Sequence, residues 1–159
     1  MKTRLLFSLL LAAVTVTAFG QPGFGTAISL YDGWRFTLTD DSAAIAPSCD
    51  DSRWQRVRVP HDWGVTQPMS PDRGSCQGYL PGGIGWYRCH FTPATAERTY
   101  IYFEGVYNRS TVYLNGHRLG YRPSGFASFL YDLTPYLRAG EDNVLAVRVD
   151  HSRQDDSRS

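Results

Sequence analysis

The three glutamates are the residues of this chain best suited to acid–base chemistry, yet the sequence places each in an unfavourable setting. Glu97 and Glu141 fall in turns, and Glu104 stands beside Gly105 at the end of an apolar run, where a capping or hydrogen-bonding role is the simpler explanation. A catalytic acid and base must converge on the same reacting group. Because a turn or a strand end accounts for each of the three glutamates, the sequence predicts no catalytic residue among them.

A histidine–aspartate pair follows Pro60, in the order His61-Asp62-Trp63. An aspartate often orients an imidazole, so the pair could belong to an acid–base site. Adjacent residues of an extended segment point in opposite directions, however, and His61 and Asp62 are therefore not expected to face each other. The segment is better interpreted as a strand exit anchored by a buried Trp63.

Three glycines, at positions 82, 83 and 85, suggest a phosphate-binding loop at first sight. Such loops lead into a helix whose N-terminus holds the anion. Here the sequence continues as Trp86-Tyr87-Arg88, which is typical of a strand, so we expect the glycines to let the chain pass close to another backbone. No serine lies in a Gly-x-Ser-x-Gly elbow, which disfavours a serine nucleophile.

The cysteines and aspartates do not form a metal-binding pattern. Cys49, Cys76 and Cys89 are an odd number, so at most one intrachain disulfide can form, and the sequence leaves its pairing open. Their spacing matches no zinc motif. The aspartate pairs lack the spacing of a calcium loop and are expected in solvated turns. We therefore predict no metal and no cofactor.

Short β-rich runs separated by Gly, Pro and Asn recur along the chain, and helical periodicity is almost absent after the N-terminus. The pattern predicts an all-β antiparallel sandwich or jelly roll. In the last run, Val144 to Val149, we expect side chains to alternate between core and solvent. The expected strands are Trp34 to Leu38, Gln55 to Val59, Gly85 to Phe91, Thr99 to Glu104, Ser110 to Leu114, His117 to Arg122 and Asn143 to Asp150.

The connections between these strands carry their own signals. Asn115-Gly116 predicts a type I′ hairpin, because that turn requires positive φ at both central residues. Thr134-Pro135 followed by Gly140 predicts one short helical turn. Residues 40–51, rich in Ala, Ser and Asp, are expected to form a surface loop.

The N-terminus has the form of an export signal. Lys2 and Arg4 precede an apolar stretch from Leu5 to Val16, and small residues end the segment at Gly20. The apolar stretch is shorter than the roughly 20 residues of a membrane span. We therefore expect an exported, periplasmic or secreted protein with no membrane segment in its mature form. A net charge of +1 in the whole chain, with no basic stripe, disfavours nucleic-acid binding.

Four short motifs follow one another in a fixed order along the chain: Val59-Pro60-His61-Asp62-Trp63, Gly82-Gly83-Ile84-Gly85-Trp86-Tyr87-Arg88, Phe103-Glu104-Gly105-Val106 and Val112-Tyr113-Leu114-Asn115-Gly116. Together they resemble the N-terminal β-sandwich of glycoside hydrolase family 2, of the β-galactosidase type. The resemblance implies a galactose-binding-like jelly roll over residues 30–150, after a signal peptide at 1–20 and a short leader at 21–29. It also implies that both catalytic glutamates belong to a later barrel, so residues 151–159 would be a truncated linker.

The resemblance also implies which residues would meet a sugar. The segment after the last strand leans toward the substrate pocket of the barrel in this family, which makes Asp150 and His151 candidate substrate-binding residues, with Trp63 as a flanking aromatic residue. Cys89 stands where the family has a lysine, which implies only a changed surface contact. The expected partners are a β-linked oligosaccharide or glycoside and the catalytic barrel.

A free-standing, lectin-like carbohydrate-binding module is the alternative function. It would need exposed aromatic side chains in a groove, because sugar rings stack on aromatic faces. The chain has ten Tyr, eight Phe and four Trp, most of which are expected to fill the core. A purely structural or protein-binding sandwich is a third possibility.

Overall fold

The computed structural model describes residues 25–73, 78–94 and 98–152 as eight strands and two short 3₁₀ helices. The expected signal peptide, the residues around Cys76, Glu97 and most of the expected linker lie outside these ranges. The elements are β1 (Trp34–Thr37), η1 (Ser42–Ile45), β2 (Gln55–Val57), η2 (Gly64–Thr66), β3 (Gly83–Phe91), β4 (Tyr100–Phe103), β5 (Ser110–Leu114), β6 (His117–Arg122), β7 (Phe129–Asp132) and β8 (Asn143–His151).

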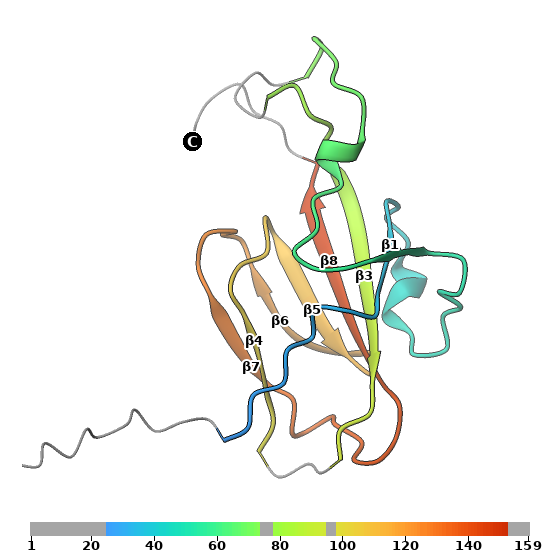
Figure 1. Ribbon diagram of the computed structural model, residues 1–159, viewed down its shortest axis with the longest axis vertical. Helices are drawn as coiled ribbons and strands as arrows, with labels where there is room; N and C mark the ends of the chain where they lie inside the picture. The colour runs from blue at the N-terminus through green and yellow to red at the C-terminus, as the bar shows by residue number, and fades with distance from the viewer. Residues whose placement is uncertain (1–24, 74–77, 95–97, 153–159) are drawn as a thin grey trace, which may run out of the picture.

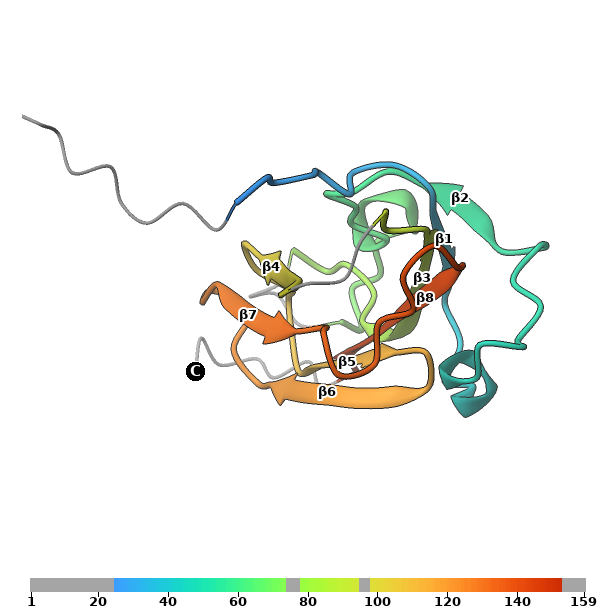
Figure 2. The ribbon, with the colours of Figure 1, turned by 90° about the horizontal axis from the view of Figure 1, so that it is seen from below.

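The strands form two antiparallel sheets, as the sequence pattern predicts for an all-β chain. The larger sheet has six strands in the order β2-β1-β3-β8-β5-β6, and the smaller consists of β4 and β7 (Figure 1). The larger sheet is curved, and β4 and β7 lie on its concave side (Figure 2). Aromatic and branched aliphatic side chains fill the space between the two layers, among them Val112, Leu145 and Phe129. Burial of this apolar surface is the main force that holds the layers together.

The predicted strands are confirmed to within two residues at each end, and the hairpin is confirmed as well. Asn115 and Gly116 have φ of 51° and 87°, the positive values that a type I′ turn requires. The Asn115 side chain also donates to Asn143 Oδ1 and accepts from the Val144 amide, at 2.8 and 2.9 Å. Because these bonds join the hairpin to the start of β8, they fix the register of the central strands.

The structure differs from the sequence-based expectations at three places. Strand β7 is absent from the predicted set, and the segment after Thr134 forms a hydrogen-bonded turn, Tyr136 amide to Leu133 carbonyl at 3.0 Å, in place of a helical turn. The expected alternation along β8 is also wrong, since Val144 to Val147 are all buried. The reason is that η1 covers the outer face: Ala44 packs there against Trp86 and Ala146.

The expectations for Gly85 and Cys89 need correction too. A Cβ on Gly85 would lie 2.7 Å from Cε2 of Phe36 and 3.2 Å from Cζ3 of Trp63, so this glycine makes room for aromatic side chains and not for a backbone. Cys89 is buried in the core, and it is therefore not a surface contact. Burial raises the pKa of its thiol to about 11, which keeps it protonated at neutral pH.

A buried arginine joins the outer face of the larger sheet to the segment that covers it. The Arg88 guanidinium donates to Asp51 Oδ2 at 2.8 Å and to four backbone carbonyls between Ala44 and Cys49. All of these acceptors belong to residues 44–51, so the guanidinium organises that segment over the sheet. The expected surface loop at 40–51 is in this way part of the packed structure.

Within the described ranges, no helix is long and apolar enough to cross a bilayer. In the same ranges, no three or more His, Cys, Asp or Glu side chains come together as metal ligands would.

Candidate functional site

The predicted substrate-binding residues Asp150 and His151 lie at the end of β8, opposite the beginning of β3. Asp150 pairs with Ile84 and His151 with Gly83 in the antiparallel register. The segment that carries Trp63 and η2 crosses this same end of the sheet (Figure 1). The structure therefore brings the three predicted residues to one end of the sandwich, although 87 positions separate Trp63 from Asp150 in the sequence.

Asp150 is an ionised carboxylate held by several donors. Ser152 donates to its Oδ1 through the amide and the hydroxyl, at 3.0 and 2.6 Å. Arg109 and Arg148 each approach to 3.4 Å. Burial opposes ionisation, but the bonds from Ser152 and Arg109 outweigh it and lower the pKa of Asp150 to about 2. The carboxylate is thus a fixed acceptor of hydrogen bonds at any physiological pH.

His151 follows Asp150 on β8, so its ring points to the opposite face of the strand, the face that carries the core residue Val149. Burial, together with the nearby charge of Arg109, lowers the pKa of the imidazole below its ordinary value, so the ring is neutral at pH 7. The ring packs edge-on against Tyr107, with centroids 5.0 Å apart. A neutral imidazole has one donor and one acceptor nitrogen, a combination that suits hydroxyl groups.

Trp63 lies in the hydrophobic core at the same end of the sandwich. Its side chain is buried, and its ring stacks on Phe36 with centroids 5.5 Å apart and planes inclined by 16°. This burial confirms the expected strand exit with a tryptophan anchor. The ring lies inside the core, so it supports the site from below and is not an exposed stacking surface.

His61 and Asp62 do not form a pair, as expected. The Nδ1 atom of His61 lies 2.8 Å from the Tyr87 hydroxyl, whereas Asp62 Oδ1 accepts from the Gly64 amide at 2.8 Å. Burial lowers the pKa of His61 and raises that of Tyr87, so both groups are neutral at pH 7. This arrangement is a structural hydrogen bond beneath η2.

Two aromatic residues at this end were not predicted. Tyr107 lies between His151 and Phe126, and its ring meets that of Phe126 with centroids 5.3 Å apart. The Phe126 side chain is 89% exposed, an unusual setting for an aromatic ring. The two residues belong to separate loops, one before β5 and one before β7, so only their contact in space reveals the group. The name end cluster is used below for Phe126, Tyr107 and His151, which touch one another in that order, together with Asp150, which lies at the same end of β8 on its opposite face.

Among the described residues, the glutamates are not placed as a catalytic pair of carboxyl groups would be. Glu104 follows β4 at the end of the sandwich where β8 finishes, and Glu141 precedes β8 at the opposite end. Retaining glycosidases need two carboxyl groups about 5 to 5.5 Å apart. Glu104 and Glu141 cannot meet that requirement, because the nine residues of β8 separate the two ends.

Comparison with known proteins decides the family. Residues 27–158 match the family model described as "Glycosyl hydrolases family 2, sugar binding domain". The chain belongs to this family. It is 47% identical over 130 residues to the β-galactosidase BoGH2A of Bacteroides ovatus, covering 79% of the chain and 15% of that protein. It is 43% identical over 132 residues to a putative β-glucuronidase of Formosa agariphila, covering 80% of the chain and 13% of that protein.

Solved structures of family 2 enzymes agree in fold. A β-glycosidase from Bacteroides vulgatus superimposes with a TM-score of 0.76 at 44% identity, covering 80% of this chain and 17% of that one. A family 2 member from Bacteroides cellulosilyticus gives a TM-score of 0.71 at 30% identity, covering 80% of this chain and 18% of that one. The chain therefore spans less than a fifth of the length of these relatives, and it matches their N-terminal sugar-binding domain.

Proposed function

We propose that this domain is the N-terminal sugar-binding domain of an exported β-galactosidase-type enzyme, with a galactose-binding-like jelly-roll fold. The observation that carries the proposal is the family match, which extends over nearly all described residues and includes a β-galactosidase at 47% identity. Hydrolysis would take place in a separate catalytic barrel that supplies two glutamates for a double displacement. The sugar-binding domain would pack beside that barrel and form one rim of its pocket.

In this proposal the end cluster is the part of the domain that meets the substrate. The Asp150 carboxylate accepts a hydrogen bond from a sugar hydroxyl, and Ser152 and Arg109 hold it in place. The neutral His151 ring packs against Tyr107 at the same end of β8. Trp63 keeps the loop above β3 in position through its contact with Phe36. A charged acceptor makes hydrogen bonds about twice as strong as a neutral one, so Asp150 contributes most to sugar binding.

Export is part of the same proposal. Residues 1–20 carry a positive start, an apolar stretch and a small-residue end, which support a signal peptide cleaved after Gly20. The β-linked substrate would then be a sugar that reaches the periplasm or the cell exterior. N-terminal sequencing of the native protein should begin at Gln21, and a start at Met1 would contradict export by this route.

The test uses the native gene product. We expect an intact mass several times that of this chain, hydrolysis of nitrophenyl β-galactoside, and a KM raised at least tenfold by Asp150→Asn. Glu141→Gln is the matched control, because it removes an exposed carboxylate at the far end of β8, and it should leave KM unchanged. If the native protein hydrolyses the β-glucuronide instead, the β-galactosidase assignment fails.

The same preparation separates the alternative. A native mass near that of the chain without residues 1–20, no hydrolysis, and millimolar or tighter binding of galactosides would identify a free-standing carbohydrate-binding module. An equal KM in Asp150→Asn and the unmodified enzyme would remove the end cluster from the substrate site while leaving the family unaffected.

A further inference from the structure

A row of three arginines crosses the outer face of the larger sheet at its β2 edge. Arg56 on β2 lies opposite Arg35 on β1, and Arg35 lies opposite Arg88 on β3. Like charges directly opposite each other on antiparallel strands destabilise a sheet. Either carboxylates of the same chain or a bound anion must therefore offset the repulsion between the three arginines.

Only the inner member of the row is neutralised. Arg88 forms a buried ion pair with Asp51 at 2.8 Å. Across the described residues, no carboxylate lies within 4 Å of the Arg35 or Arg56 guanidinium, whereas Arg35 donates to the Ser52 carbonyl at 3.2 Å. Hydrogen bonds from Ser52 and, to a smaller degree, the charge of Arg35 lower the pKa of Asp50. The Asp50 carboxylate accepts its hydrogen bond from the Ser52 amide, at 2.9 Å, and forms no ion pair with Arg35 among the described residues. Arg35 and Arg56 thus present two adjacent positive groups to solvent.

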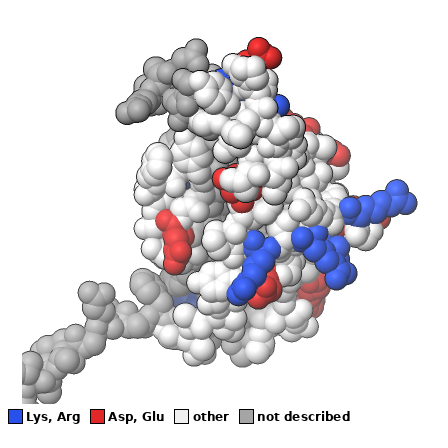
Figure 3. Space-filling model, turned by 45° about the horizontal axis from the view of Figure 1, so that its top comes forward, with Lys and Arg blue, Asp and Glu red and all other residues white. Residues whose placement is uncertain are grey.

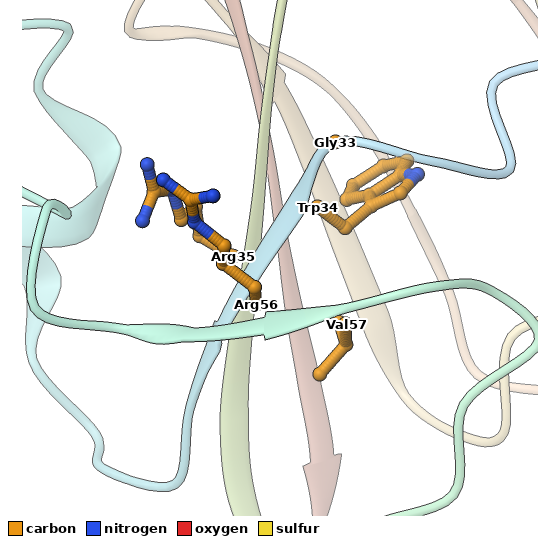
Figure 4. A pocket seen from close by; sticks show the side chains of 5 residues that line it. All are labelled: Gly33, Trp34, Arg35, Arg56 and Val57. Atoms are coloured by element: carbon orange, nitrogen blue, oxygen red, sulfur yellow. The ribbon is translucent and has the colours of Figure 1, made fainter.

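The two guanidinium groups point in the same direction. Figure 4 shows them side by side on one side of the β1–β2 crossing, with Trp34 and Val57 turned to the other side. A depression of about 260 Å³ lies here, lined by Gly33, Trp34, Arg35, Arg56 and Val57. Positive side chains also gather at one side of the molecule in Figure 3, with acidic side chains beside them. Planar guanidinium groups in such a pair fit the oxygens of a carboxylate or a sulfate.

A second depression is lined by residues that directly follow β2 and by an aromatic residue that precedes β1. It measures about 280 Å³ and is lined by Tyr31, Arg58, Val59 and Pro60. The Tyr31 side chain is half exposed. Arg58 pairs with Asp32 at 3.1 Å, but both side chains are mostly exposed, and such a pair contributes little. An exposed ring near guanidinium groups that have no buried carboxylate partner suits a ligand that has both an apolar face and a negative charge.

We propose that the β1–β2 edge is a second carbohydrate-binding surface, specific for an anionic glycan. A carboxylate or sulfate ester of the glycan lies between Arg35 and Arg56, and a neighbouring sugar ring lies on Tyr31. The choice of a glycan rests on the family of this domain and on Tyr31. The surface is separate from the end cluster, because β1 and β3 lie between β2 and β8 in the sheet. It would hold a charged polysaccharide near the enzyme without taking part in hydrolysis.

The experiment measures binding of the full chain to three polymers with one backbone: dextran, carboxymethyl-dextran and dextran sulfate. We expect retardation in affinity gels by at least one charged polymer and none by dextran. Because exposed charges are screened, the retardation should weaken as salt is raised from 50 to 500 mM. The polymer that binds more tightly tells whether carboxylate or sulfate is preferred.

Charge-matched variants locate the surface. The double variant Arg35→Gln/Arg56→Gln should lose at least tenfold in affinity, whereas Arg118→Gln/Arg138→Gln, with the same change in net charge at exposed positions elsewhere, should lose less than twofold. Arg35→Lys/Arg56→Lys keeps the charge and loses the planar groups, so it should fall between them. Tyr31→Ala should weaken binding without altering the salt dependence. Thermal unfolding within a few degrees of the unmodified chain confirms folding of each variant.

Three outcomes would overturn the proposal: no retardation by either charged polymer, an equal loss in the two glutamine double variants, or equal binding to DNA, which would indicate a general polyanion surface. The end cluster is tested independently, since Asp150→Asn should leave binding of the charged polymers unchanged. A negative result in the polymer-binding experiment therefore does not affect the proposed substrate site. An unchanged KM in Asp150→Asn likewise does not affect the proposed anionic-glycan surface.

Discussion

At the scale of single residues, the buried Arg88–Asp51 pair has the largest expected effect on stability. A buried charge that loses its partner typically costs 3 to 5 kcal/mol, because neither water nor a counter-ion replaces it. The Arg88 side chain is fully buried and that of Asp51 nearly so. The four backbone carbonyls that also bind Arg88 keep the guanidinium in place even without Asp51.

We therefore predict that Asp51→Ala lowers the free energy of unfolding by about 3 kcal/mol or more in urea titrations. Asp50→Ala is the matched control, because Asp50 is the adjacent, exposed aspartate, whose carboxylate accepts from the Ser52 amide. Asp50→Ala should cost clearly less than Asp51→Ala, because the Asp50 carboxylate is exposed to water and balances no buried charge. Equal effects of the two substitutions would show that the Arg88 contact contributes nothing beyond a loop hydrogen bond.

A second residue-scale prediction concerns His90, which bridges two aspartates. Its Nδ1 lies 2.8 Å from Asp142 Oδ2 and its Nε2 lies 3.0 Å from Asp51 Oδ2. Burial alone would lower the pKa of this imidazole, but the hydrogen bonds to Asp142 and Asp51 outweigh it and raise the pKa. NMR titration of the ring signals should thus place His90 above the ordinary value near 6.5, and His61 and His151 below it.

The sign of the linked stability effect follows from the raised pKa. A group whose pKa is raised by folding stabilises the fold fully below its unfolded pKa and loses that contribution as pH rises through the folded value. The difference in unfolding free energy between the unmodified chain and His90→Asn should be largest below pH 6.5 and shrink above it. A difference that grows with pH would contradict the assignment. Comparing the two proteins removes the opposite contributions of His61 and His151.

At the scale of elements, the sequence predicted correctly those features that depend on neighbouring residues alone, such as the hairpin turn. Asn115-Gly116 located its hairpin because the turn itself demands positive φ, and this requirement is independent of the remainder of the fold. Strand β7 was missed for a physical reason. Burial alternates along β7, but Phe129, Leu130 and Tyr131 are all apolar or aromatic, so the short run shows no alternation of apolar and polar residue types in the sequence.

The same distinction applies to the candidate site. The resemblance supplied Asp150 and His151 because they belong to a recognisable segment, which the structure places at the end of the last strand, β8. Tyr107 and Phe126 could not be found that way, since their rings meet across two separate loops. The outer-face contacts of Arg88 were equally hidden, because the sequence gives no sign that residues 44–51 fold back over β3. Contacts between distant segments are the part that sequence patterns leave undetermined.

At the scale of the whole molecule, the two sheets differ strongly in size. Strands β4 and β7 cover the concave face of a six-stranded sheet, and within the described residues they pair only with each other. Their outward side carries Tyr102 opposite Leu130, which are 60% and 38% exposed. A sheet edge with apolar residues beside it can pair with another chain. This small sheet is therefore the expected site of self-association when the chain is studied alone.

We predict that Tyr102→Lys reduces concentration-dependent light scattering of the full chain at least twofold, because a charge on an edge strand opposes pairing between copies. Val65→Lys is the control: Val65 is 67% exposed in η2, which belongs to neither sheet and presents no strand edge, so the same added charge there should have a smaller effect. Both variants should unfold within about 0.5 kcal/mol of the unmodified chain, as surface substitutions usually do. Equal scattering in Tyr102→Lys and the unmodified chain would show that the β4 edge does not mediate association, whereas an equal decrease in both variants would assign the effect to net charge.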